Sequence, residues 1–221
     1  RYDDQQDVGR TFHTFTTADG LGGKVMWGAR EDSQGNIWLS RSSLLIGGMS
    51  EVVRFDGHRV TTFTMVDGLM YSVIPIQEDS KGRMWFGGVN GVSLYDARQN
   101  VDRQDVGEGF TIFTTADGLV DNRVHVLGVD SRGDLWFSTG RWQGASLVRC
   151  DGRRSSRTVP ASFTTFTAEN GLGVGAAFSM LEDRAGHLWF DLHNGVSRYD
   201  GRTSSRADSV SFTTFTTENG L

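Results

Sequence analysis

Short apolar runs separated by glycine-rich polar turns recur along this chain at intervals of about fifty residues. The clearest recurrence is the phrase Phe-x-x-Phe-Thr leading into Gly-Leu, in which Val60 once replaces the first phenylalanine. It ends at five leucines, which are Leu21, Leu69, Leu119, Leu172 and Leu221. The intervals between these leucines are 48, 50, 53 and 49 residues, which indicates a tandem array of one structural unit.

Each full unit contains two further phrases. An acidic turn followed by Gly-x-x-Trp runs from Asp32 to Trp38, Asp79 to Trp85, Asp130 to Trp136 and Asp183 to Trp189. A residue pair ending in aspartate follows at Phe55-Asp56, Tyr95-Asp96, Cys150-Asp151 and Tyr199-Asp200, and once earlier at Tyr2-Asp3. In the third unit the pattern predicts four strands, Arg123 to Val129, Asp134 to Ser138, Ala145 to Arg149 and Ser162 to Thr167. No window shows helical periodicity, and four short antiparallel strands per unit are typical of a propeller blade.

The predicted fold is therefore an all-β propeller of four-stranded antiparallel blades in one domain, residues 1–221. Four full blades span 22–69, 70–119, 120–172 and 173–221, and residues 1–21 form a surplus half blade. Alternatively, the N-terminal hairpin pairs with the last inner hairpin and displaces residues 198–221. Either arrangement leaves a bare strand edge, so we expect that strands from a second copy complete the ring, as a homo-oligomer with strand exchange, or that the chain is part of a larger ring.

Two segments resemble the repeats of two-component regulator propellers. They are Leu181-Glu182-Asp183-Arg184-Ala185-Gly186-His187-Leu188-Trp189-Phe190 and Gly195-Val196-Ser197-Arg198-Tyr199-Asp200-Gly201, and the resemblance extends over the whole chain. It implies a periplasmic or extracellular sensor domain of a hybrid histidine kinase or related regulator, which recognises ligands such as oligosaccharides or mediates dimerisation. The chain departs from the pattern at Val129, where an acidic residue is expected, and at Cys150, which takes an aromatic position.

Composition narrows the possible partners. A net charge of −5 with scattered basic residues disfavours nucleic acid and anionic membranes. No run approaches the roughly 18 apolar residues of a membrane helix, so we expect no membrane insertion by this segment. Cys150 is the single cysteine and is expected to be a small strand residue. Because the chain starts at Arg1 without methionine, we expect that it was cut from a longer precursor or array.

The repeated residues have structural explanations. We expect Trp38, Trp85, Trp136 and Trp189 to pack between blades. The turn aspartates preceding them are expected to cap turns, because one or two carboxylates fall short of the roughly 6 to 8 oxygens that calcium takes. No zinc spacing, Walker loop or nucleophile motif is present in the sequence, so we predict no metal and no cofactor.

Residues that differ from unit to unit are the better candidates for a site. The connections between successive units and those between the second and third strands share one face of the ring, which we call the upper face. The predicted ligand-binding residues on it are Lys24, Trp27, Tyr71, Asn122, Arg123, His125, Trp142, Phe178 and His193. Arg41, Gln143 and Asn194 are further candidates from the same loops. Aromatic rings with a few amides and cations suit sugars or peptides, although the same side chains could simply plug the channel.

These observations favour a non-catalytic, sensor-type module that binds a small polar ligand. The first alternative is a structural or protein-interaction scaffold using the polar loops 98–109 and 153–161. The second is a lyase using His125 or His193, because some propellers of the streptogramin lyase type place a histidine and a glutamate on this face. The sequence does not place Glu169 or Glu218 beside either histidine, so an acid–base pair is not evident.

Overall fold

The computed structural model describes residues 16, 25–42, 51–69, 76–100, 109–140, 144–151, 163–201 and 212–219. Within these ranges the chain forms four antiparallel sheets of four strands each, in sequence order within every sheet. The first two sheets contain β1 (Val25–Glu31), β2 (Ile37–Ser42), β3 (Glu51–Phe55), β4 (Val60–Phe63), β5 (Ile76–Glu78), β6 (Met84–Gly88), β7 (Gly91–Tyr95) and β8 (Phe110–Phe113). The other two contain β9 (Val124–Val129), β10 (Leu135–Thr139), β11 (Ser146–Cys150), β12 (Phe163–Phe166), β13 (Ala177–Glu182), β14 (Leu188–Leu192), β15 (Gly195–Tyr199) and β16 (Phe212–Phe215).

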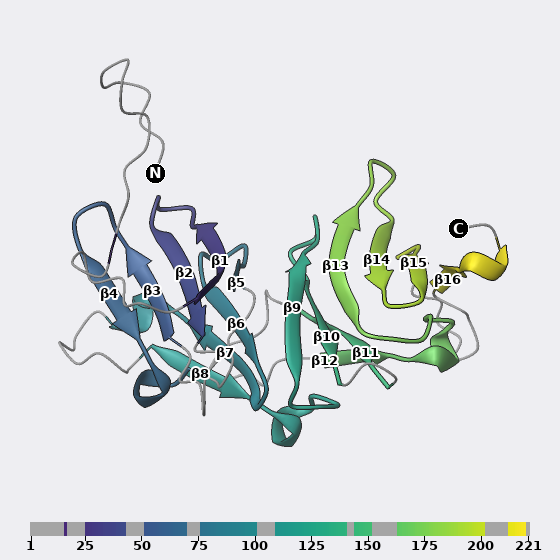
Figure 1. The fold of residues 1–221 in the computed structure, drawn as a ribbon, viewed down its shortest axis with the longest axis horizontal. Coiled ribbons are helices and arrows are strands. Elements are labelled where there is room, and N and C mark those ends of the chain that lie inside the picture. The colour runs from purple at the N-terminus through teal and green to yellow at the C-terminus, as the bar shows by residue number, and fades with distance from the viewer. Residues whose placement is uncertain are drawn as a thin grey trace, which may run out of the picture.

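The four sheets follow one another around an arc, with β1–β4 at one end and β13–β16 at the other (Figure 1). The first strand of each sheet contacts the first strand of the next, β1 with β5, β5 with β9 and β9 with β13. These strands therefore line the inside of the arc. The arrangement is that of propeller blades, and we number the sheets as blades 1 to 4 in chain order.

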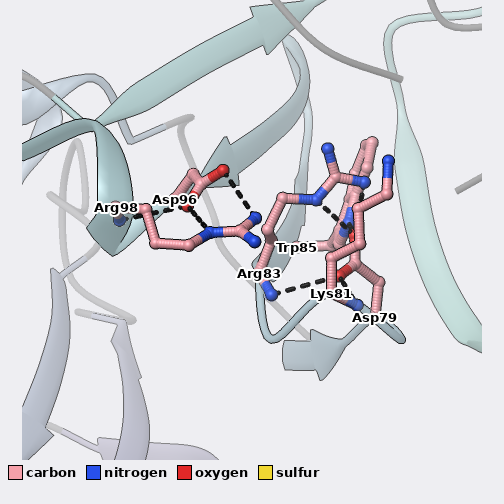
Figure 2. Close-up of polar contacts among 6 residues, drawn as sticks. All are labelled: Asp79, Lys81, Arg83, Trp85, Asp96 and Arg98. Carbon is pink, nitrogen blue, oxygen red and sulfur yellow. Dashed lines mark hydrogen bonds and ion pairs between the residues drawn. The ribbon is translucent and has the colours of Figure 1, made fainter. Parts of the chain in front are cut away.

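The turn between the first two strands of each blade is organised by one aspartate. In blade 2, Asp79 accepts backbone hydrogen bonds from Lys81 (2.9 Å) and Arg83 (3.1 Å) through Oδ1. Its Oδ2 accepts from the indole Nε1 of Trp85 at 2.9 Å and from Nε of Arg83 at 2.7 Å. Figure 2 shows this carboxylate enclosed by the three partners. The carboxylate thus fixes both the turn and the orientation of the tryptophan.

The other three blades repeat this geometry. The indole of the matching tryptophan donates to Oδ2 of Asp32 (2.7 Å), Asp130 (3.0 Å) and Asp183 (2.8 Å). The turn glycine beside each of them has a positive φ, for example 82° at Gly133, which suits a residue without Cβ. The predicted turn-capping role of these aspartates is confirmed.

Short 3₁₀ turns follow the fourth strands, and the sequence analysis did not predict them. The turns are Met65–Asp67, Thr115–Asp117, Ala168–Asn170 and Thr217–Asn219. At the first one Thr64 caps the backbone of Val66, while the Asp67 carboxylate accepts from the backbone nitrogen of Thr64 at 2.7 Å. This reciprocal cap is a Thr-x-x-Asp box, which blade 2 repeats at Thr114, while blade 3 has Asn170 at the acidic position. A single turn is too short to show a helical period.

Aromatic side chains form the core between neighbouring blades. Trp38 of blade 1 lies 5.6 Å from the ring of Tyr95 in blade 2, and Trp136 of blade 3 lies 5.2 Å from Tyr199 in blade 4. Trp38, Trp85 and Trp136 are at most 1% exposed, as predicted. Trp189 is only partly buried, which corrects the prediction for blade 4, because no described blade follows it.

Arg41 also differs from its predicted place. It belongs to strand β2 rather than to a loop, is 3% exposed, and forms an ion pair with Glu51 at the start of β3. Its guanidinium therefore stabilises this pair of strands and is withdrawn from the upper face.

Candidate functional site

A pocket of about 440 Å³ opens where three blades meet on the inside of the arc. It is lined by Gly88 and Val89 of blade 2, Arg123, Val124, His125, Ser138 and Gly140 of blade 3, and Ala176, Ala177 and Phe178 of blade 4. We call this the channel-mouth pocket. Most of its wall is aliphatic or glycine backbone, so its polar groups are few and distinct.

Arg123 stands at the entrance, directly before β9 begins at Val124. Its backbone nitrogen donates to Oδ1 of Asp121 at 2.6 Å, and its carbonyl accepts from the nitrogen of Gly140 at 3.1 Å. These bonds fix the main chain while the side chain stays exposed. The pocket therefore has a cation at its rim on a firmly held backbone.

His125 is the second residue of β9 and pairs across the sheet with Ser138 of β10. Burial lowers the pKa of this histidine below 6.5, although a hydrogen bond with the backbone of Ala177 opposes that shift. The imidazole is therefore neutral at pH 7 and can act as a hydrogen-bond donor or acceptor. Nearby, the Ser138 hydroxyl accepts from the nitrogen of Ala177 at 3.0 Å, which ties blade 4 to blade 3 at the floor of the site.

Phe178 is the second residue of β13 and occupies the place in blade 4 that His125 occupies in blade 3. Its ring is 44% exposed, an unusual state for a phenylalanine in an inner strand. A partly exposed ring and a neutral imidazole that line one pocket offer a stacking surface together with a directional polar contact. A cation completes the set, so the pocket combines three kinds of interaction with a ligand.

The structure thus brings three predicted site residues together, Arg123, His125 and Phe178. Asn122 points elsewhere, because its Oδ1 accepts from the backbone of Thr115 at 2.8 Å. Trp27 lies in β1, but its side chain is outside the described part of the structure, as are Lys24, Tyr71, Trp142 and Gln143.

His193 lies in a different hollow of about 770 Å³ at the top of blade 4. Its other lining residues are Gly173, Val174, Leu192, Asn194, Gly195, Thr214, Thr216, Thr217 and Glu218. We call it the blade 4 hollow. Glu218 and His193 both line it, which the sequence analysis missed because 25 residues separate them and the connecting loops decide where each one lies.

Two other features are absent from the residues that the structure describes. These residues contain no group of three or more His, Cys, Asp or Glu side chains that could hold a metal ion. Among them there is also no helix with the length and apolar character needed to cross a membrane.

Residues 118–141, which contain Arg123 and His125, match the family model described as "Two component regulator propeller". The chain carries a two-component regulator propeller repeat. No curated protein sequence matches the chain closely enough to identify a relative. The matched repeat covers the inner hairpin of blade 3, which contributes half of the channel-mouth pocket.

Solved structures share the fold of the chain that carries this two-component regulator propeller repeat. The extracellular domain of a hybrid two component system from B. thetaiotaomicron has a TM-score of 0.59 at 21% identity, covering 92% of this chain and 28% of that one. PorZ, a surface component of the type-IX secretion system of Porphyromonas gingivalis, has a TM-score of 0.63 at 18% identity, with coverages of 93% and 29%. Virginiamycin B lyase from Staphylococcus aureus has a TM-score of 0.58 at 14% identity, with coverages of 89% and 57%.

These likenesses show the propeller fold and leave the function open. The chain spans less than a third of the first two proteins. One protein is part of a signalling system, one belongs to a secretion system and one is an enzyme. The function of this chain must therefore be argued from the residues of its candidate site rather than from its fold.

Proposed function

We propose that this chain is a ligand-recognition module of the sensor type, without catalytic activity, and that its ligand binds in the channel-mouth pocket. The observation that carries the proposal is the convergence of Arg123, His125 and Phe178 on one pocket. All three stand at positions that differ between blades, whereas residues needed for the fold recur in each blade.

The chemistry of the pocket favours a small polar ligand such as an oligosaccharide or a short peptide. Phe178 offers a ring for stacking on a sugar face or an apolar side chain. The neutral imidazole of His125 orients a hydroxyl or amide, and Arg123 attracts a carboxylate or another acceptor. We also propose that this module lies in the periplasm or outside the cell, which its likeness to an extracellular domain and to a surface component supports.

Thermal unfolding against a panel of oligosaccharides and short peptides tests the proposal. A ligand held at about 100 times its dissociation constant stabilises the folded state by roughly 2.7 kcal/mol. We expect one ligand class to raise Tm, and we expect Phe178→Ala and Arg123→Ala to abolish the shift.

The matched control is Leu181→Ala, because Leu181 lies on the same strand as Phe178, is 66% exposed, and is absent from the pocket lining. It should retain the ligand-induced shift. Binding that survives both pocket substitutions, or no shift across a broad panel, would overturn the proposed site.

A lyase is the second candidate, and one observation favours it. His193 and Glu218 line the same hollow, and an imidazole with a carboxylate is a common acid–base pair. If the chain is a lyase, its incubation with the panel of oligosaccharides and peptides will release unsaturated products, and His193→Ala will stop their formation. Absence of product with every candidate substrate would exclude it.

A further inference from the structure

The two ionisable side chains of the channel-mouth pocket, Arg123 and His125, stand at places where the fold requires neither of them. Counted back from the turn aspartates, the place of Arg123 is taken in the other blades by small uncharged residues, which are Val25, Ser72 and Ala176. The place of His125 is taken there by apolar residues, which are Trp27, Ile74 and Phe178. An inner strand therefore forms without a cation or an imidazole, and in blade 3 their chemistry can serve a ligand.

Arg123 gives the rim of the pocket a positive charge. The described residues that line the pocket include no aspartate or glutamate. Asp121, the nearest acid along the chain, accepts from the backbone nitrogen of Arg123 at 2.6 Å, and none of the described carboxylates pairs with the guanidinium. In a chain whose net charge is −5, this pocket is thus a local site that attracts anions.

His125 adds a hydrogen-bond acceptor to the same wall. Its hydrogen bond with the backbone of Ala177 favours the protonated ring, so the imidazole N–H donates and the Ala177 carbonyl accepts. A neutral imidazole has a single N–H, which this bond uses, and its other nitrogen carries a lone pair. That nitrogen has no partner among the described residues. It can therefore accept a hydrogen bond from a hydroxyl of a ligand.

Strand geometry directs both side chains to one ligand. Arg123 and His125 are two residues apart, and side chains alternate along a strand, so both project to the same side of β9. A ligand that satisfies both needs a carboxylate for the guanidinium and a hydroxyl for the imidazole. Sugar acids carry both groups on one ring, and the apolar face of that ring can lie on Phe178.

We infer that the ligand of the channel-mouth pocket is an acidic oligosaccharide, whose carboxylate binds Arg123 and whose hydroxyl donates to His125. This inference rests on the proposed function and narrows its ligand from small polar molecules to sugar acids. A peptide with a free carboxyl terminus supplies the anion but lacks the ring hydroxyls. The pocket volume of about 440 Å³ lies within the range of roughly 300 to 1,000 Å³ that is typical of small-molecule sites.

Isothermal titration calorimetry with matched probes tests the charge of the ligand. The probes are short oligosaccharides of galacturonic, glucuronic and mannuronic acid, each compared with its methyl ester, which keeps the hydroxyls and loses the charge. We expect one acid to bind at least about tenfold more tightly than its ester, because the ester cannot form a charge-assisted bond with Arg123. Added salt should weaken binding of the acid and leave binding of the ester unchanged.

Substitutions separate the two contacts. Arg123→Gln should make acid and ester bind alike, and Arg123→Lys should keep part of the preference for the acid. His125→Phe, which introduces the residue type of Phe178, should weaken acid and ester by similar factors, because both carry the hydroxyls. Arg132→Gln is the matched control, since it removes one positive charge from an exposed turn of blade 3 that does not line the pocket. It should retain the full preference.

The outcomes distinguish this inference from the proposed function. Equal affinity for acid and ester, with binding that Phe178→Ala abolishes, would leave the pocket in place and refute the acidic ligand. A preference for the acid that survives Arg123→Gln would refute it too, as would tight binding of peptides with a free carboxyl terminus while every sugar acid fails. If no saccharide or peptide binds at all, the proposed function fails together with this inference.

Discussion

The aspartate at the start of each inner turn accepts hydrogen bonds through both of its carboxylate oxygens. The pKa of Asp183 is held well below its usual value by hydrogen bonds from the Trp189 indole, the His187 backbone and side chain, and the Ala185 backbone. For Asp32, burial opposes ionisation, yet bonds from Trp38 and Asn36 outweigh it and lower the pKa. These carboxylates are thus ionised in the native state and make charge-assisted hydrogen bonds.

Replacing this aspartate should cost different amounts in different blades. In blade 2, Asp79→Ala removes the carboxylate from the turn, from Trp85 and from the buried Arg83, which lies 2.6 Å away. We expect a loss of roughly 3 kcal/mol of unfolding free energy there, against about 1.5 kcal/mol for Asp32→Ala, where no arginine side chain contacts the carboxylate. Urea denaturation of both variants checks the order, and equal losses would contradict it.

His125 should make stability depend on mildly acidic pH. Because its pKa is lowered in the folded state, the unfolded chain binds more protons once pH falls below about 6.5. Unfolding free energy is therefore predicted to decline from pH 6.5 downward until the folded-state pKa is passed. His125→Gln should flatten this part of the profile in chemical denaturation measured from pH 7.5 to 5, and an unchanged slope would assign the effect to another group.

At the scale of elements, a contact that we call the serine–glutamate latch keeps successive inner turns in register. Ser33 donates its backbone N–H and its hydroxyl to Glu78 of the next blade, and Ser131 donates the same two groups to Glu182. Two of the three described junctions have it, whereas Val129 takes the glutamate position at the junction of blades 2 and 3. Val129 packs instead against the apolar cluster there. One junction therefore relies on apolar packing where the other two use hydrogen bonds.

Removing a latch should weaken one junction measurably. Glu182→Ala deletes both bonds to Ser131, and we expect a loss of about 0.5 to 1 kcal/mol, small because the site is partly solvated. Glu169→Ala is the matched control, since the Glu169 side chain is exposed in a 3₁₀ turn away from this junction. If thermal or urea unfolding ranks the two variants alike, the latch contributes little.

The strands were predictable because each repeat has the same pattern of apolar runs and glycine-containing turns. The prediction of Arg123 to Val129 for a first strand differs by one residue from β9, and the second, third and fourth strands differ by similar margins. The 3₁₀ turns were missed because a single turn leaves no periodic trace, although the Thr-x-x-Asp box at Thr114 signals it.

At the scale of the whole molecule, the candidate site was only partly predictable. Variation between blades identified Arg123, His125 and Phe178, since strand register places them at one end of the inner strands. Strand register does not reveal that the Asn122 side chain accepts a hydrogen bond from the backbone of Thr115, nor that His193 and Glu218 line the same hollow. Both depend on loop conformation, which the pairing of the strands does not determine.

The aspartate–tryptophan bond has a consequence for how the molecule is made. Its partners are six residues apart, and the hairpin around it closes within one blade. Short sequence separation favours fast closure of this hairpin, whereas contacts between blades join residues that are distant in sequence. We therefore expect a blade leaving the ribosome to close its inner hairpin early and to dock on the blade already synthesised, so that assembly advances from the N-terminal side by one repeat at a time.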